Sequence, residues 1–589
     1  MRASEKVLPG WLRNYDAFSA HLDEQLADEN PHTKGLRFVN FAHALLPRIP
    51  QTEGFEEFEL NKKLSHDKGV DILTSTNESG DQLFAQSKFR IRRTDEIDSI
   101  ISKFENFEAD HLAKSYTSQP ALFEDPNEPA ISRPVYLVVT ASNLNALLDN
   151  YRQSKRSSRP FFDSLMEENR LRFADGNQLL LSLQSTYRKS FEVPSQMRIK
   201  AITSWLHVES VHLGVVSGLE LVRLYEEHGD GLFFENIRSF LGLERNQDRE
   251  SVNRRILKTV EELPEKMLER NNGITIRASA VSAGADTELI LDNASIVNGC
   301  QTTMCVVERR DLAQDNLLVA VKIVESTDLW EVAHSANYQN RVRQIDLDLA
   351  KYLRPQLVQK AAARMGISVE PDSSHGVTDL IATISDTQVT YEETKALYKG
   401  VFSDRPNNIF DNHYNKLLTT VLDVLYEKED AADRVFAGLF VISGASRKGR
   451  EEVSRILTET ETLYFQRFKK AAYTSYISLL AAGAITNTNL AERAADPQEE
   501  ATRLLRFIEE VRNMIETDDE PFIEAYLTSY EILSESGFEA ITEESGDALV
   551  SKNLYNKIAT TPYETYYKTL CMRLQRAKSR QERASSRRQ

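Results

Sequence analysis

Three polar residues in the first part of the chain have the types and spacing that metal-dependent chemistry on a phosphodiester requires. Asp71 ends the apolar run Gly69-Val70-Asp71, and Gln86 and Lys88 lie in a second run some 15 residues later. Cutting such a bond needs a hard divalent cation on oxygen ligands and a positive charge beside the attacking water. Asp71 and the Gln86 side-chain oxygen would bind the metal, and Lys88 would orient the water. These residues predict a nuclease that uses Mg²⁺ or Mn²⁺.

The elements around these residues indicate how they are positioned. Gln86 and Lys88 are two apart on a predicted strand, so both side chains lie on the same face. Turn residues separate three strand-like runs, and a helical pattern stands on each side of them. We expect helix, three strands and helix to form one α/β unit, followed by a polar linker at 116–133. Its elements are expected near residues 35–46, 55–62, 69–75, 82–90 and 94–106.

A basic run, Lys88-Phe-Arg-Ile-Arg-Arg, continues directly from the predicted strand. We expect Arg90, Arg92 and Arg93 to bind the nucleic-acid backbone. The chain carries a formal net charge of −17, so such binding would depend on a local basic surface. A second basic stretch, from Arg573 to Arg588, is more typical of a solvated helix face.

Length and composition limit the class of protein. A chain of 589 residues is too long for one core, and we expect domains at 1–130, 131–400 and 401–589. Apolar and charged contents of 41% and 27% are ordinary for a soluble globular protein. Three cysteines give neither a disulfide framework nor a zinc spacing. Without an apolar run of roughly 18 residues, we expect a cytoplasmic protein that makes no membrane contact.

The pattern changes twice downstream. A buried-looking strand at 135–140 opens the second domain, in which helical and strand patterns alternate to about residue 400. Beyond residue 410, long helical stretches dominate, such as 451–482 and 499–517. The expected fold class is therefore α/β, with a mixed middle domain and a mostly helical C-terminal region.

Four segments of the middle domain are unusually polar. They are Phe234–Gly242, Asn271–Ile276, Ile296–Thr303 and Asn337–Asp346. Asn-Gly pairs permit left-handed turns, and Asn or Thr side chains cap helices. The third segment is predicted to be a strand-to-helix turn, whose free backbone N–H groups would suit an anion.

Two roles are open for these segments. Amide and arginine side chains can read base edges or phosphates, which would make the domain a reader of DNA or of a nucleotide signal. Equally, the same residues can form a buried amide network that satisfies the backbone of the turns. The candidates for a shared polar site are Asn236, Arg238, Asn272, Asn298, Gln301, Thr302, Asn337 and Arg341.

The first group of motifs resembles a known superfamily. Gly-x-x-Phe on a helix, then Gly-Val-Asp, then Gln-x-Lys resembles the PD-(D/E)xK restriction endonucleases, and among them the Mrr-like branch, over about residues 33–110. In that branch glutamine replaces the usual glutamate of the second motif. The resemblance implies that Asp71 is the principal metal ligand, Gln86 a second ligand and Lys88 the catalytic lysine. Asp67 would be an accessory ligand.

One position departs from that pattern. The Mrr-like helix carries a glutamate that helps to bind the metal, and Val39 stands in its place. Asp67, Glu59 or the scissile phosphate would have to compensate. The departure leaves an alternative in which a degenerate nuclease fold senses nucleic acid without cutting it. RNA is an alternative substrate, because the metal chemistry is the same.

The four polar segments together resemble the AIPR family, the abortive-infection phage-resistance proteins. Its signatures Asn-x-Arg-x-x-Leu-Gly, Asn-Asn-Gly-Ile and Ile-Val-Asn-Gly-x-Gln-Thr-Thr occur in order within about residues 205–365. This resemblance implies a bacterial antiphage role and fits a nuclease domain at the N-terminus. The expected partners are DNA, a second copy of the chain, since cutting two strands takes two sites, and a small-molecule or phage-derived activator.

Overall fold

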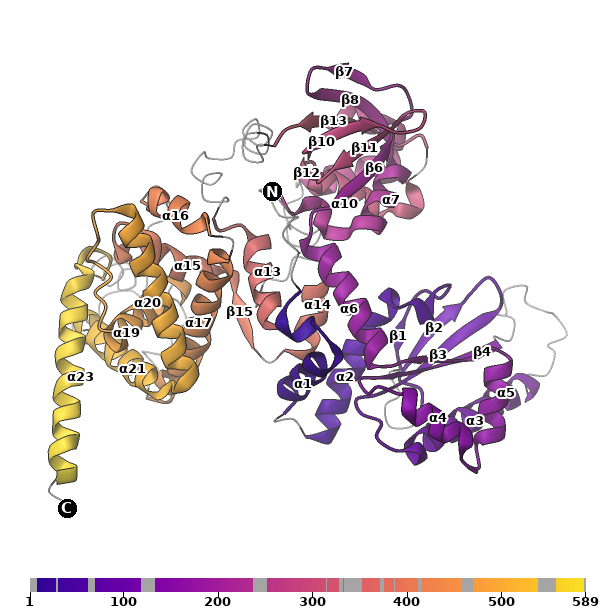
Figure 1. The fold of residues 1–589 in the computed structure, drawn as a ribbon, viewed down its shortest axis with the longest axis horizontal. Coiled ribbons are helices and arrows are strands. Elements are labelled where there is room, and N and C mark those ends of the chain that lie inside the picture. The colour runs from indigo at the N-terminus through magenta and orange to yellow at the C-terminus, as the bar shows by residue number, and fades with distance from the viewer. Residues whose placement is uncertain are drawn as a thin grey trace, which may run out of the picture. The chain divides into compact units, whose positions relative to one another are not determined.

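Two units make up the chain, and each is described by itself (Figure 1). Unit 1 contains Met1–Glu192 and Ser374–Asp386, and unit 2 contains Val193–Ser373 and Thr387–Gln589. The computed structural model describes residues 8–27, 30–61, 69–117, 133–236, 252–313, 315–327, 332, 352–370, 376–385, 387–410, 416–428, 430–456, 470–538 and 558–586. Within these ranges, no helix has both the length and the apolar character needed to cross a membrane.

Unit 1 is built on a five-stranded sheet in the order β1-β2-β3-β4-β5. The first three strands are antiparallel, and β3, β4 and β5 are parallel. The strands are β1 (Glu59–Leu60), β2 (Ile72–Thr76), β3 (Asp81–Lys88), β4 (Arg133–Thr140) and β5 (Leu171–Ala174). The helices are α1 (Tyr15–Gln25), α2 (Pro31–Leu45), α3 (Thr94–Thr117), α4 (Asn145–Gln153), α5 (Arg159–Glu167), α6 (Gly176–Phe191) and α14 (Val377–Ile384).

The strand expected to open the second domain belongs to this sheet. β4 pairs with β3 along its whole length, from Asp81 opposite Arg133 to Lys88 opposite Thr140. The boundary expected after residue 130 therefore falls inside a sheet, and unit 1 continues to Glu192. The sequence of β4 is a nearly continuous apolar run because a central parallel strand is covered on both faces.

Aromatic residues fill the core of unit 1 between the sheet and its helices. Phe104 of α3 stacks on Tyr136 of β4 with ring centroids 4.6 Å apart, and the Tyr136 hydroxyl donates to Glu108 at 3.0 Å. Phe38 and Phe41 of α2 are fully buried. Figure 1 shows α3, α4 and α5 together on one side of the sheet. This packing holds β3, the strand of Gln86 and Lys88, between two helical layers.

Unit 2 begins with a mixed α/β region. Its five-stranded sheet has the order β12-β9-β13-β8-β7, in which β13 is parallel to β9 and antiparallel to β8. A three-stranded sheet, β10-β11-β6, and a two-stranded sheet, β14-β15, complete it. The strands are β6 (Gln196–Lys200), β7 (Leu206–Val208), β8 (Val211–Ser217), β9 (Ile274–Ala278), β10 (Ala280–Ala283), β11 (Glu288–Asp292), β12 (Ser295–Asn298), β13 (Leu318–Glu325), β14 (Ser368–Glu370) and β15 (Gln388–Thr390), and the helices are α7 (Gly218–His228), α8 (Val252–Glu262), α9 (Met267–Arg270) and α10 (Cys300–Glu308).

The rest of unit 2 is helical, which confirms the expectation for the C-terminal region. Tyr476 of α19 and Tyr563 of α23 meet edge to face at 5.8 Å in its core, and Tyr566 and Tyr567 are buried beside them. The helices are α13 (Pro355–Met365), α15 (Tyr391–Phe402), α16 (Thr419–Tyr426), α17 (Ala431–Ile456), α19 (Lys470–Ile485), α20 (Pro497–Thr517), α21 (Glu520–Phe538) and α23 (Tyr563–Ser586).

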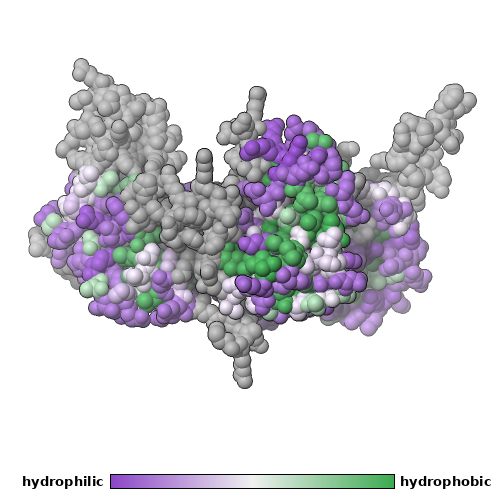
Figure 2. Space-filling view, turned by 90° about the horizontal axis from the view of Figure 1, so that it is seen from above, coloured by the Kyte–Doolittle hydropathy of each residue, from purple (hydrophilic) through white to green (hydrophobic). Residues whose placement is uncertain are grey.

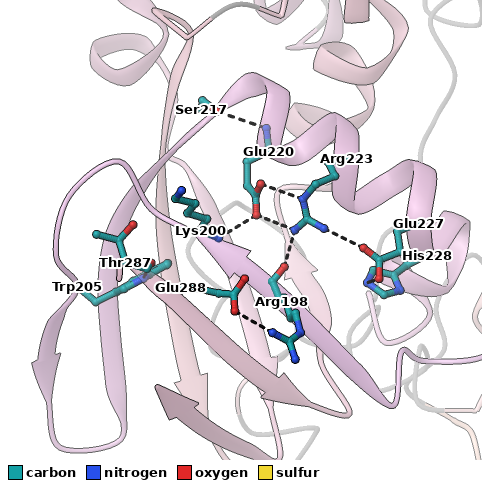
Figure 3. Close-up of polar contacts among 10 residues, drawn as sticks. All are labelled: Arg198, Lys200, Trp205, Ser217, Glu220, Arg223, Glu227, His228, Thr287 and Glu288. Carbon is teal, nitrogen blue, oxygen red and sulfur yellow. Dashed lines mark hydrogen bonds and ion pairs between the residues drawn. The ribbon is translucent and has the colours of Figure 1, made fainter. Parts of the chain in front are cut away.

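Side chains of α7 cover the outer edge of the three-stranded sheet (Figure 3). β6 is its edge strand. The Lys200 N–H donates to Glu220 Oε1 at 2.8 Å, and Arg223 Nη2 donates to the Arg198 carbonyl at 2.6 Å. Glu220 and Arg223 also pair with each other at 2.8 Å. Two edge groups that could bind another strand, the Lys200 N–H and the Arg198 carbonyl, are thus already satisfied.

The β7–β8 hairpin carries exposed apolar residues. Leu206 pairs with Leu213 and Val208 with Val211, so these four side chains share one face. Leu206 and Val208 are 58% and 54% exposed. Figure 2 looks down on the side where Figure 1 places β7 and β8, and it shows hydrophobic residues gathered there.

Candidate active site

The end of β3 brings the three predicted residues of unit 1 together. Gln86 and Lys88 both lie in β3, and Asp71 directly precedes the neighbouring strand β2. The Ser87 N–H donates to Asp71 Oδ2 at 2.7 Å. The Asp71 carboxylate therefore lies against the backbone between Gln86 and Lys88.

A break in regular pairing turns Asp71 toward β3. The Asp71 N–H donates to the Ala85 carbonyl at 2.9 Å, although Ile72 is the residue paired with Ala85. Two residues of one strand facing one residue of the other is the arrangement of a β-bulge, which re-aims side chains. Gly69 adopts a φ of +86° just before it, where an added Cβ would lie 2.7 Å from the Lys103 Cβ. Both constraints favour glycine in the Gly-Val-Asp motif.

Gln86, the residue before Ser87 in β3, carries a buried side-chain oxygen. Its side chain is 1% exposed, and Oε1 has no hydrogen-bond partner within the part of the chain that the structure describes. A buried acceptor without a donor costs about 1–3 kcal/mol, so a ligand at this atom would relieve that cost. An amide oxygen beside a carboxylate fits a hard divalent cation.

Other candidate metal ligands add little to Asp71 and Gln86. Asp67 lies outside the described residues. Val39 is half-buried in α2, and Glu59 is exposed in β1. Among the residues described, no three His, Cys, Asp or Glu side chains form a group able to bind a metal ion. The fit to a cation thus rests on Asp71 and Gln86, with water or phosphate oxygens completing the shell.

The basic residues after Gln86 differ in their surroundings. Lys88 is exposed at the end of β3. Arg90 is held inside unit 1, where it donates to the Ala141 carbonyl at 2.9 Å and pairs with Asp23 at 2.9 Å. Arg93 is exposed and pairs with Asp95. Arg92 is exposed as well, which leaves Lys88, Arg92 and Arg93 accessible to a partner.

In unit 2, the predicted strand-to-helix turn is confirmed. β12 ends at Asn298, Gly299 is the N-cap with a φ of +100°, and α10 begins at Cys300. A Cβ at Gly299 would lie 2.5 Å from Ile274 Cγ2. Both the backbone angle and the close approach of β9 therefore require glycine here.

Three of the four polar segments meet around this turn. Asn236 is 2% exposed, and its Nδ2 donates to the Ile296 carbonyl at 3.2 Å. Asn271 Nδ2 lies 3.0 Å from the buried Thr302 Oγ1, and Asn271 Oδ1 accepts from the Gly273 N–H at 2.8 Å. These contacts are those of an amide network that satisfies the backbone of the turns.

The remaining residues of the expected polar site differ in their surroundings. Asn272 is exposed, and Asn298 and Gln301 are half-buried. Sequence reasoning chose Asn272 and missed Asn271, although an asparagine two residues before a glycine in a turn is a known signal for a side-chain-to-backbone bond. The others, Arg238, Asn337 and Arg341, lie outside the described residues.

A buried ion pair joins the first segment to Arg277, the residue directly after the second segment, and was not predicted. Arg277 Nε donates to Glu235 Oε2 at 3.1 Å, and both side chains are buried. Burial raises the pKa of Glu235, against the opposing effect of Arg277 and Arg354. Burial also lowers the pKa of Arg354 to about 10, although Glu235 opposes it. No local sequence signal marks such a pair, because charged residues are ordinarily exposed.

The two cysteines of α10 behave as core residues. Cys300 and Cys305 are buried. Burial raises the pKa of the Cys300 thiol far above its usual value and that of Cys305 to about 12. A thiol is a nucleophile only when ionised, so neither suits that role.

Residues 233–563 match the sequence model of a family described as AIPR protein. No curated protein and no solved structure matches the chain. The family match contains the polar segments and most of the helical region, and the Asp71–Gln86–Lys88 site lies before it. Membership implies a role in phage defence by abortive infection. Because the match covers more than half of the 589 residues, the chain belongs to the AIPR family.

Proposed function

We propose that this protein is a DNA endonuclease that depends on Mg²⁺ or Mn²⁺ and acts in abortive infection. The observation that carries the proposal is the 2.7 Å hydrogen bond from the Ser87 N–H to Asp71 Oδ2. It supports the proposal because the carboxylate lies against the backbone between Gln86 and Lys88, which the resemblance to the Mrr-like nucleases would make a metal ligand and the catalytic lysine. Gln86 Oε1, which has no hydrogen-bond partner among the described residues, supports the same assignment.

In this proposal each side chain has a separate task. Asp71 and Gln86 hold the cation, which when bound polarises the scissile phosphate and lowers the pKa of the attacking water. The Ser87 N–H fixes the Asp71 carboxylate so that little reorganisation is needed. The Lys88 ammonium group orients the water and offsets the negative charge of the transition state.

The proposed partners follow from the task and the surface. Arg92 and Arg93, exposed beyond β3, contact the phosphate backbone. Cutting both strands calls for two sites, hence a homodimer. We take the enzyme to be cytoplasmic and to require a small-molecule or phage-derived activator. That requirement would keep it from cutting the host genome when the activator is absent.

Plasmid cleavage by the purified full chain tests the proposal. We expect nicking or linearisation of supercoiled DNA with Mg²⁺ or Mn²⁺, and a loss of roughly 100-fold or more in Lys88→Ala. Lys155→Ala is the matched control, because Lys155 is another exposed lysine of unit 1. Equal cutting by Lys88→Ala and the control would contradict the assignment.

A second candidate function is nucleic-acid sensing without cleavage. Val39 in place of the helix glutamate favours it, because only one described carboxylate, Asp71, then belongs to the site. This candidate predicts DNA or RNA binding that weakens steeply with salt and no metal-dependent product. The same assay with an RNA substrate separates the two candidates and tests the RNA alternative.

A further inference from the structure

Asn61, directly after β1, makes two hydrogen bonds to the segment that carries Asp71. Its backbone N–H donates to the Asp71 carbonyl at 2.9 Å. Its side-chain Nδ2 donates to the Val70 carbonyl at 2.8 Å. One residue therefore satisfies two consecutive carbonyls.

The Val70 and Asp71 carbonyls both point toward β1. A regular strand does not have this arrangement, because its successive carbonyls point to opposite edges. β1 can offer a backbone donor to only one of them. The other would be left without a partner, at a cost of about 1–3 kcal/mol where water is excluded. The Asn61 amide supplies that second donor and so stabilises the bulge.

The bulge in turn decides where the Asp71 side chain points. The β2–β3 register, in which Ile72 pairs with Ala85, places the Val70 carbonyl opposite Ser87, but this carbonyl accepts from the Asn61 side chain on the side of β1. On the side of β3, the Ser87 N–H therefore bonds to the Asp71 carboxylate instead of a backbone oxygen. The direction of the carboxylate thus follows from the contacts that Asn61 makes.

We propose that Asn61 is a positioning residue of the active site, which holds the bulge at Asp71 so that the Asp71 carboxylate faces Gln86 and Lys88. The inference rests on the proposed function, in that Asp71 is taken as a ligand of the catalytic cation. In this role Asn61 acts through the Val70–Asp71 backbone and the Asp71 carboxylate.

Replacing the side chain tests this role. Asn61→Leu keeps the backbone N–H and the approximate volume but removes the Nδ2 donor. We expect an affinity for Mn²⁺ about tenfold weaker, measured by titration of the full chain without DNA. The Mn²⁺ concentration for half-maximal plasmid cleavage should rise by the same factor.

Asn77→Leu is the matched control. Asn77 lies in the turn between β2 and β3, where Nδ2 donates to the Gly54 carbonyl at 3.2 Å and Oδ1 accepts from the Ser79 and Asp81 N–H groups. Asn77→Leu loses comparable hydrogen bonds at the same sheet. We therefore expect this variant to have a lower Tm and the Mn²⁺ affinity of the wild type. If Asn61→Leu fails to fold, Asn61→Asp removes the same donor with less change of shape.

The outcomes separate the inference from the proposed function. Wild-type cleavage together with unchanged Mn²⁺ affinity in the Asn61 variants overturns the positioning role and leaves the nuclease assignment intact. A wild-type chain that neither binds Mn²⁺ nor cuts overturns both. Weaker Mn²⁺ binding in the Asn61 variants but not in Asn77→Leu supports the role of Asn61.

Discussion

Gln86 Oε1, a buried oxygen without a hydrogen-bond donor among the described residues, is the most informative atom of the candidate site. Glutamine at position 86 can be buried at modest cost because it is neutral, whereas a second carboxylate beside Asp71 would repel it. The site thus carries a single negative charge on its described ligands. A cation bound there would be held less tightly than by two carboxylates, and its retention would depend on the substrate phosphate.

Gln86→Glu tests this electrostatic argument. The added carboxylate, buried next to Asp71, should lower the Tm in the absence of divalent cations and raise cation affinity in their presence. Thermal unfolding of the full chain with and without Ca²⁺ measures both effects. Gln82→Glu, on the same strand, is the control and should show the ion-induced shift of the wild type. A shift in Gln86→Glu no larger than that of the control would remove Gln86 from the metal site.

Local spacing was enough to find the candidate triad, since strand periodicity alone places Gln86 and Lys88 on one face. It could not reveal Asn61 or the Glu235–Arg277 pair, because those roles arise from partners distant in sequence. Arg90 shows the same limit. A basic run predicts a charged surface, but only the fold shows that Arg90 bonds to Asp23 and the Ala141 carbonyl.

At the scale of elements, periodicity gave the type of most segments and not their partners. The apolar run of β4 was recognised as a buried strand, yet its place beside β3 was not, because strand pairing is set by tertiary packing rather than by local pattern. The edge of β6 illustrates this further. Its protection by Glu220 and Arg223 depends on how α7 lies against the strand (Figure 3).

Removing the Glu220 and Arg223 side chains from the edge of β6 should promote self-association of the protein and have little effect on its stability. In Glu220→Ala/Arg223→Ala, the Lys200 N–H and the Arg198 carbonyl lose their partners and become open to another strand. We expect concentration-dependent self-association in light scattering with only a small fall in Tm, because the Arg223 and Glu220 side chains are 44% and 12% exposed and water can take their place at the open edge. The control Arg198→Ala/Glu288→Ala breaks an ion pair of the same sheet without exposing its edge. Identical scattering by both variants would show that the edge needs no cover.

At the scale of the whole molecule, the two units differ in how they respond to acid. His21 of unit 1 is 8% exposed, and burial lowers its pKa to about 4. Glu500 of unit 2 is fully buried and bonds to Arg493, Arg503 and the Ala494 N–H. Burial alone would raise its pKa, but these hydrogen bonds outweigh burial and lower it to about 2. The fold therefore favours the neutral form of His21 and the ionised form of Glu500, and protonation of either side chain is disfavoured.

Acidification should consequently destabilise the units in separate pH ranges. An unfolded histidine binds a proton near pH 6.5, so the contribution of the neutral His21 to the stability of unit 1 is fully present above that value. Unit 1 loses roughly 3 kcal/mol as the pH falls toward 4. The Glu500 contribution is present above the unfolded pKa near 4.3 and is lost, also by roughly 3 kcal/mol, as the pH falls toward 2. Calorimetry of the full chain should show one transition shifting between pH 6.5 and 4.5 while the other moves only below pH 4.5. His21→Leu should abolish the first shift and Glu500→Gln the second; the reverse pairing would contradict the assignment of these groups.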